Sequence, residues 1–280
     1  MLLYYAMGGG LGHLTRARAF LHTTGLDGEA VLFTSSSFAD DPRVTGGLGV
    51  VRVPADLDGD PEGLRAFLER TISDLGVRRL VVDALPAGIL GELANFAPPP
   101  GLELWHVARL LRWERYAADA SARLPRFDRT FVVEALHENH RRSLEASSGE
   151  VCELELVDPS SAVPAPIEAP YVLVVHSGPD EETSDLVACA RELARAEGSG
   201  ARLVLVSPER PRNLPPDVTW RDTFPATGLF AEAERIVTAA GFNAVRQTAP
   251  FRSKRFLVPY PRRFDDQFAR AALASQRSLG

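Results

Sequence analysis

Residues 2–22 read LLYYAMGGGLGHLTRARAFLH and join an apolar run, a glycine-rich loop and an amphipathic stretch. Leu2 to Ala6 predicts a strand, Gly8 to Gly12 a loop, and Leu14 to His22 a helix. Glycine lets the backbone approach a ligand closely, and the first amides of the following helix can bind an anion. The segment therefore predicts the opening unit of a doubly wound α/β domain, with a candidate site in its loop.

Outward from this segment, short apolar runs alternate with longer amphipathic stretches. Strands are expected at 30–34, 49–53, 79–83, 102–107, 130–133, 171–175, 202–206, 218–221, 235–238 and 255–258. Helices are expected at 61–75, 183–197, 242–249 and 263–275, with the end of a small helix at 231–234. Continuous apolar runs separated by helices are typical of parallel strands that are covered on both faces.

A proline-rich segment divides this pattern into two halves. Residues 157–170, VDPSSAVPAPIEAP, hold four prolines and two serines, which predicts a linker. We therefore expect two Rossmann-like doubly wound domains, over residues 1–160 and 161–262, facing a cleft. A final helix within 263–280 is expected to pack back toward the first domain. Ligands of such sheets bind outside the carboxyl ends of the strands.

Composition excludes several classes of function. Lys and Arg number 31 against 37 Asp and Glu, a formal net charge of -6, which argues against a nucleic-acid partner. Cys152 and Cys189 show neither CxxC nor zinc spacing, so we expect a reducing, cytoplasmic compartment and no disulfide framework. The first ten residues lack the basic start of a signal peptide, and no run of about 18 apolar residues predicts a membrane span.

Three positions near predicted strand ends carry side chains suited to chemistry. His13 lies at the mouth of the glycine loop, where a helix dipole favours the neutral imidazole that acts as a base; capping the helix is the alternative role. Asp83 ends the strand at 79–83 and can orient His13, bind a sugar hydroxyl or cap the next helix. Arg109, Arg112 and Arg115 are expected to share one helix face. Arg109 is the nearest to a strand end and the best candidate for a phosphate or carboxylate.

Two distant segments together resemble the GT-B glycosyltransferases, the group that includes the MurG-type N-acetylglucosaminyltransferases. The first is GGGLGHLTRA at 8–17. The second is AAGFNAVRQTA at 239–249, followed by FLVPYP at 256–261 and DDQFARA at 265–271. The second set is similar to that group's donor-binding motif, in which a glycine turn opens a helix and an acidic residue one turn later holds the ribose. The motifs occur in the expected order along the chain.

The resemblance implies an acceptor-side first domain and a second domain that binds a nucleotide sugar, expected to be a UDP sugar. The implied catalytic residues are His13 and Asp83. The implied acceptor- or phosphate-binding residues are Gly10, Leu11, Gly12, Arg16 and Arg109. The implied donor-binding residues are Gly178, Phe224, Gly241, Phe242, Asn243, Gln247, Asp265, Asp266 and Gln267. Gln247 departs from the family, which has glutamate there, and Ala244 stands where threonine or serine is common.

The activity that the resemblance implies is an inverting sugar transfer to a hydroxyl acceptor, with no metal ion or other cofactor. Two alternatives remain open. The pattern Gly10-x-Gly12-His13-x-x-Arg16 is also similar to PseG-type nucleotide-sugar hydrolases, in which water would replace the acceptor. A nucleotide-sugar-binding protein without activity is the other, motivated by Gln247 and Ala244. A dehydrogenase is disfavoured because no acidic residue ends the second strand. Peripheral membrane contact and the oligomeric state stay open.

Overall fold

The computed structural model describes residues 1–120, 124–160 and 165–276. The chain divides into two compact units. Unit 1 comprises Met1–Pro159 and Arg263–Asp265, and unit 2 comprises Ser160–Arg262 and Asp266–Gly280. The break after Pro159 falls inside the proline-rich segment, of which residues 161–164 lie outside the described residues.

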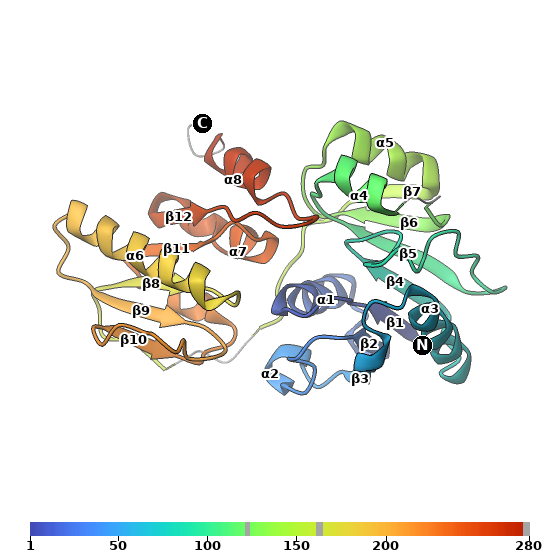
Figure 1. The fold of residues 1–280 in the computed structure, drawn as a ribbon, viewed down its shortest axis with the longest axis horizontal. Coiled ribbons are helices and arrows are strands. Elements are labelled where there is room, and N and C mark those ends of the chain that lie inside the picture. Colours follow the sequence, from blue (N-terminus) through green and yellow to red (C-terminus); the bar gives the residue numbers. More distant parts are fainter. Residues whose placement is uncertain (121–123, 161–164, 277–280) are drawn as a thin grey trace. The chain divides into compact units, whose positions relative to one another are not determined.

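The described part of unit 1 contains a parallel sheet of seven strands in the order β3-β2-β1-β4-β5-β6-β7 (Figure 1). The strands are β1 Leu2–Tyr5, β2 Ala30–Thr34, β3 Gly49–Arg52, β4 Arg79–Asp83, β5 Glu103–Ala108, β6 Phe127–Val132 and β7 Ser148–Glu153. The helices are α1 Leu11–Thr24, η1 Asp27–Glu29, α2 Pro42–Thr45, η2 Ala55–Leu57, α3 Pro61–Asp74, α4 Trp113–Ala120 and α5 Glu138–Ser147. This order, in which β1 lies centrally, is that of a doubly wound fold.

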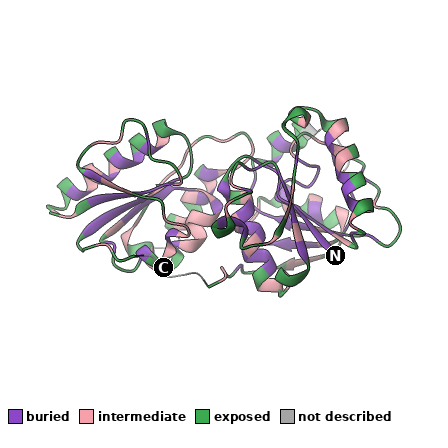
Figure 2. Cartoon of the chain, turned by 90° about the horizontal axis from the view of Figure 1, so that it is seen from below, coloured by how far each residue is buried: buried purple, intermediate pink, exposed green. Residues whose placement is uncertain are grey.

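Apolar side chains from alternate strand positions cover both faces of this sheet. On one face Leu3 and Val82 join a core with Leu64 and Leu68 of α3. On the other face the ring of Tyr4 lies 5.7 Å from that of Phe20 in α1. Figure 2 accordingly shows buried strands and helices with one exposed side. The sheet edge that carries the ends of β1 and β4 is thereby held by packing on both sides.

Among the described residues of unit 2, five parallel strands follow the order β10-β9-β8-β11-β12. The strands are β8 Tyr171–Val175, β9 Arg202–Val206, β10 Val218–Arg221, β11 Arg235–Ala239 and β12 Arg255–Val258. The helices are α6 Asp180–Ala196, η3 Ala226–Leu229, α7 Phe242–Gln247, η4 Ala249–Lys254 and α8 Gln267–Gln276. Helix α6 packs on one face through Leu186 and Ala190, and η3 covers the other through Leu229. The α/β class with two doubly wound sheets is confirmed.

Two sequence-based helices are wrong in part. The arginines 109, 112 and 115 do not share a helix, because β5 runs to Ala108 and α4 begins only at Trp113. The stretch between them is held by a bridge from Leu111 to Asp265 and by a bond from Arg112 N to Phe264 O at 2.7 Å. Residues 231–234 are not helical; the short helix there is η3, which ends at Leu229.

The C-terminal segment also differs from expectation. Helix α8 begins at Gln267 rather than at 263 and packs within unit 2, where Arg270 Nη1 donates to Ala240 O at 3.1 Å. Only Arg263–Asp265 groups with unit 1. Helix α5 and strand β7 were not expected, because ENHRRSLEAS and SGEVCE are mostly polar and carry a weak apolar pattern.

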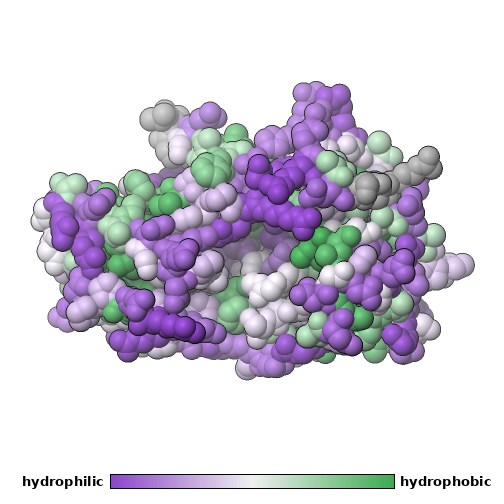
Figure 3. All heavy atoms as spheres, viewed as in Figure 1, coloured by the Kyte–Doolittle hydropathy of each residue, from purple (hydrophilic) through white to green (hydrophobic). Residues whose placement is uncertain are grey.

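Hydrophilic side chains cover most of the visible face, and the hydrophobic patches on it are small and separate (Figure 3). In the described ranges, every helix is too short or too polar to cross a lipid bilayer.

Candidate active site

The glycine loop between β1 and α1 needs glycine at its start and leaves space beyond it. Gly8 has φ +143°, and a Cβ there would lie 2.6 Å from His13 Cδ2, so no other residue fits without displacing the imidazole. Gly9 and Gly10 differ, since a Cβ at either would meet nothing within 4 Å. A tight turn explains why residue 8 is glycine, but it does not explain why residues 9 and 10 are glycine too. Their backbone is therefore open to close approach, at the start of a helix whose first turn carries no acidic residue.

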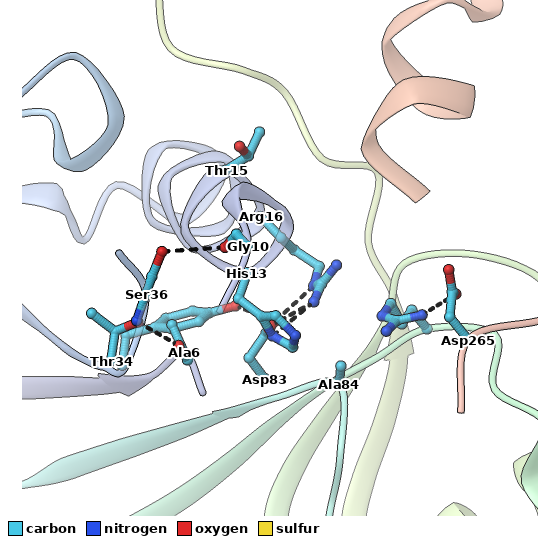
Figure 4. Close-up of polar contacts among 12 residues, drawn as sticks. Ala6, Gly10, His13, Thr15, Arg16, Thr34, Ser36, Asp83, Ala84 and Asp265 are labelled. Atoms are coloured by element: carbon cyan, nitrogen blue, oxygen red, sulfur yellow. Dashed lines mark hydrogen bonds and ion pairs between the residues drawn. The ribbon is translucent and has the colours of Figure 1, made fainter. Parts of the chain in front are cut away.

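His13 and Asp83 meet at the carboxyl ends of the strands β1 and β4 (Figure 4). His13 is the third residue of α1, and Asp83 is the last residue of β4, which pairs with β1. Nδ1 of His13 lies 2.6 Å from Oδ2 of Asp83. Burial raises the pKa of Asp83, but Arg16 and His13 lower it more, so the carboxyl stays ionised well below its usual range.

This contact settles which ring nitrogen of His13 carries the proton. Nδ1 stands between the Asp83 carboxylate and a guanidinium donor, Nη2 of Arg16, at 3.3 Å. Only the carboxylate can accept, so Nδ1–H donates to Asp83 and the lone pair is on Nε2. With 17% of the His13 side chain exposed, the imidazole is held in place and still reaches the surface.

The protonation of His13 is set mainly by burial. Burial lowers the pKa of His13, the bond to Asp83 raises it, and the charges of Arg16 and Arg109 lower it again, with a net decrease from 6.5. The neutral imidazole expected from the sequence is thus supported, but the expected cause, the helix dipole, is not the main one. At pH 7 Nε2 is available to accept a proton.

Two further side chains bind the same carboxylate. Arg16 Nε donates to Oδ1 at 2.7 Å and Nη2 to Oδ2 at 2.5 Å, while Tyr4 Oη donates to Oδ1 at 3.0 Å. The structure therefore places Arg16, expected to bind the acceptor or a phosphate, against Asp83 with 3% of its side chain exposed. Tyr4 was missed, because a tyrosine within an apolar strand gives no sign of a polar partner on the next strand.

The backbone is strained directly after Asp83. Ala84 has φ +63°, which costs a non-glycine residue about 1 kcal/mol or more. The turn is held by a bond from Leu85 N to Asp83 O at 2.7 Å, and Nε2 of the buried His106 lies 3.4 Å from Ala84 O. Strain retained beside a candidate catalytic residue is common at functional sites.

Arg109 and Asp265, expected on the acceptor and donor sides, form an ion pair within unit 1. Their side chains are 10% and 16% exposed. The guanidinium of Arg109 thus has a carboxylate partner, and its charge still acts on His13.

The residues beside Asp265 have contacts of their own. Asp266 Oδ1 accepts from Ala269 N at 3.1 Å at the start of α8, and Gln267 Oε1 accepts from Tyr260 N at 3.0 Å. Gln267 is 4% exposed. The three residues expected to bind the sugar therefore have different neighbours, and their role in donor binding stays a prediction.

Gly178, after β8, lies against an imidazole. A Cβ at Gly178 would stand 2.5 Å from His176 Nε2, so glycine is required by packing. His176 Nε2 lies 3.1 Å from Glu182 Oε2, and both terminal nitrogens of Arg262 donate to the Glu182 carboxylate. The expected role of Gly178 in donor binding stays a prediction, and sequence reasoning missed these three partners.

The remaining donor candidates gather around α7. Gly241 precedes α7, Phe242 is buried, and Asn243 and Gln247 are half-buried on the same short helix. Thr238 of β11 pairs with Val175 of β8, so the loops that carry Gly178 and Gly241 leave the sheet from adjacent strands. Phe224 is half-buried between β10 and η3. In the parts of the chain that the structure covers, no three His, Cys, Asp or Glu side chains come together as a metal site.

No family model and no curated protein sequence matches the chain. Solved structures do. A spinosyn forosaminyltransferase, SpnP, matches with a TM-score of 0.63 at 15% identity, over 99% of this chain and 83% of that one. A spinosyn rhamnosyltransferase, SpnG, in complex with thymidine diphosphate has a TM-score of 0.58 at 12% identity, over 93% of this chain and 81% of that one. UDP-GlcNAc 2-epimerase from Neisseria meningitidis, bound to UDP-GlcNAc, has a TM-score of 0.59 at 10% identity, over 94% and 84%. The similarity extends over nearly the whole chain, and the protein has the GT-B fold.

Proposed function

We propose that the protein is a glycosyltransferase that moves a sugar from a nucleoside diphosphate sugar to a hydroxyl acceptor. The observation that carries this proposal is the hydrogen-bonded pair His13–Asp83 at the carboxyl edge of the unit 1 sheet. A neutral imidazole fixed by an ionised carboxylate is suited to remove a proton from a hydroxyl group. The fold adds support, since glycosyltransferases are among the solved structures that share it.

The proposed reaction is a single displacement. Nε2 of His13 takes the proton of the acceptor hydroxyl as its oxygen forms a bond to C1 of the donor sugar. The bond from C1 to the phosphate oxygen breaks at the opposite side, and the nucleoside diphosphate leaves with the electron pair. The configuration at C1 is therefore inverted. Asp83 keeps its charge and stabilises the imidazolium that forms.

We expect the diphosphate to bind nearer to α7 than to α6. The first turn of α6 carries Asp180, Glu181 and Glu182, which repel an anion at that helix start. The first turn of α7 carries no acidic residue and follows Gly241, where a Cβ would meet nothing within 4 Å. Backbone amides there can approach a phosphate closely. We propose that no metal ion takes part in the transfer.

We propose that the donor carries a pyrimidine nucleoside, either thymidine or uridine. Among the solved structures that share the fold, two are complexes with thymidine diphosphate and one is bound to UDP-GlcNAc. Gln247 would bond the ribose through its amide, which offers a donor and an acceptor but no charge. Gly178 and Phe224 stay candidates for the donor site, together with Asp265, Asp266 and Gln267.

A thermal-shift screen with TDP, UDP, GDP and CDP, each alone and as its glucose conjugate or, for GDP, its mannose conjugate, tests the proposal. A ligand that binds the native state raises its apparent stability, by about 2.7 kcal/mol at a hundred times the dissociation constant. We expect TDP or UDP compounds to raise the melting temperature and GDP compounds not to. No shift with any of the eight would overturn the proposal.

The stabilising donor then separates transfer from hydrolysis. The release of nucleoside diphosphate is measured by chromatography and phosphorus NMR. Release that requires an added hydroxyl acceptor supports the transferase. Release of free sugar at the same rate without acceptor would identify a hydrolase instead. Binding without any release, over a panel of sugars, would identify a binding protein.

A further inference from the structure

Arg16 meets the Asp83 carboxylate with a fork of two donors, one on each oxygen (Figure 4). Such a fork fixes the plane of a carboxylate as well as its charge, which a lysine ammonium cannot do. His13 Nδ1 contacts the same oxygen, Oδ2, that Arg16 Nη2 contacts. The plane set by Arg16 therefore decides where the partner of the imidazole stands.

The Arg16 guanidinium lies on the buried side of the site. Arg16 is one helical turn after His13 on α1, and 3% of its side chain is exposed against 17% for His13. Tyr4 of β1 adds a hydroxyl to Oδ1, the oxygen farther from the imidazole. Arg16 and Tyr4 thus hold Asp83 on its buried side, and His13 contacts it on the side nearer the surface.

Other charged or titratable groups act on this cluster from neighbouring elements. They are Tyr4 of β1, Arg109 after β5, His106 of β5, and Asp265, which acts on Arg16. Arg16 and Arg109 are the cations that lower the pKa of His13. Without the positive charge of Arg16, less repulsion would act on a protonated His13, while Asp83 would still attract it. The pKa of His13 would therefore rise.

We propose that Arg16 is a positioning residue, which fixes Asp83 so that His13 presents Nε2 as an unprotonated base, rather than a residue that binds acceptor or phosphate. This inference rests on the proposed role of His13. It deepens that role by naming the group behind the pair, and it reassigns a side chain for which the sequence motif alone suggested contact with a ligand.

Nitrogen NMR of the protein labelled with ¹⁵N-histidine tests the proposal without a donor. The two ring nitrogens report the tautomer and the titration midpoint of each imidazole. The chain has six histidines, and the signal missing in His13→Gln identifies His13. In the wild type we expect protonated Nδ1 and a midpoint below that of a solvent-exposed histidine.

Arg16→Met should move the His13 midpoint to higher pH and mix the tautomers, since charge and fork are both lost. Arg16→Lys should keep most of the charge, mix the tautomers and move the midpoint less. Arg18→Met is the matched control on the same helix, because Arg18 Nη1 donates to a backbone carbonyl, Arg43 O, at 3.0 Å. That variant should leave the tautomer and midpoint of His13 unchanged.

Circular dichroism establishes that each variant is folded. If Arg16→Met does not fold, Arg16→Lys decides the question. A His13 spectrum and midpoint identical to the wild type in the folded Arg16 variants would overturn the positioning role. The donor screen is independent of this result: a His13 shift without any nucleotide binding would retain the positioning of His13 by Arg16 and reject the transferase.

Discussion

Both units place an imidazole against a glycine after their first strand. His13 lies against Gly8 in unit 1, and His176 lies against Gly178 in unit 2. In each unit the strand is central in its parallel sheet, and an arginine and a carboxylate complete the cluster. The same elements, a strand end, a glycine and a helix start, have thus produced similar groups twice.

The two carboxylates are held differently. Asp83 stands at a strand end with no exposed side-chain surface, and each oxygen accepts two bonds. Glu182 is in the first turn of α6, is 14% exposed, and receives the fork of Arg262 from the segment after β12. Arg262 lowers the pKa of Glu182 against the effect of burial. We therefore expect Asp83 to support proton transfer by His13, and Glu182 to fix the loop after β8.

Loss of each imidazole gives the largest contrast. His13→Ala should lower turnover about 10² to 10⁴-fold, the usual contribution of a general base, with nucleotide affinity unchanged. His176→Ala should leave turnover at saturating donor within about threefold, because we assign it no proton transfer. Both are measured by release of nucleoside diphosphate from the donor found in the screen. His22→Ala, on the exposed part of α1, is the control. Equal losses in the first two variants would contradict the distinction.

Neutralising each carboxylate compares their contributions to stability. Asp83→Asn leaves the buried Arg16 without its counter-ion and should lower the free energy of unfolding by about 3–5 kcal/mol. Glu182→Gln, nearer the surface, should cost about 1 kcal/mol. Urea unfolding at pH 7 measures both. A larger loss in the unit 2 variant would show that strand placement is not what strengthens the first cluster.

Adding a methyl group at each glycine displaces the imidazole beside it. Gly8→Ala also has to adopt φ +143°, and we expect turnover to fall about tenfold to a hundredfold as His13 moves. Gly178→Ala should weaken nucleotide binding or stability more than turnover. Gly200→Ala, where a Cβ meets nothing within 4 Å, serves as the control. Wild-type turnover in the Gly8 variant would separate the position of His13 from catalysis.

Two further buried imidazoles, His106 and His140, complete the comparison and give the smallest effect. Burial lowers the pKa of His140 to about 3 and that of His106 to about 4, below 6.5 in the unfolded chain. Between pH 6.5 and 4 the unfolded state binds protons that the folded state does not, so stability falls as pH falls, by about 1.4 kcal/mol per unit for each group.

His140→Phe keeps the ring stacked on Trp113 and should reduce the wild-type slope by about 1.4 kcal/mol per pH unit, the share of one imidazole. Urea unfolding at pH 7 and 5.5 measures the slope in the wild type and the variant. An unchanged slope would mean that His140 is not a source of the pH dependence.

Much of the fold could be predicted, because apolar runs mark buried parallel strands. β2, β4, β8, β9, β10 and β12 have the predicted bounds. The contact between His13 and Asp83 could be expected for a related reason, because both residues lie near the carboxyl ends of the paired strands β1 and β4. Their catalytic role stays a prediction. Helix α5 and β7 could not be predicted, since polar edge elements carry little periodicity.

The sequence could not predict side-chain contacts between residues that are far apart along the chain. Arg16 and Tyr4 bind Asp83 from 67 and 79 residues away. Arg109 pairs with Asp265 over 156 residues. The helix expected through Arg109 fails for this reason, because the bridge from Leu111 to Asp265 overrides the local pattern.

The three-residue return of Arg263–Asp265 to unit 1 has a consequence for synthesis on the ribosome. A nascent chain that has reached residue 159 has the whole sheet of unit 1 but neither Phe264, which packs against Tyr116, nor the carboxylate that pairs with Arg109. Unit 1 is therefore completed only after the sheet of unit 2 has been translated. Fragments cut at the linker should lack this last contact, and dissection of the chain needs residues 263–265 supplied to the first fragment.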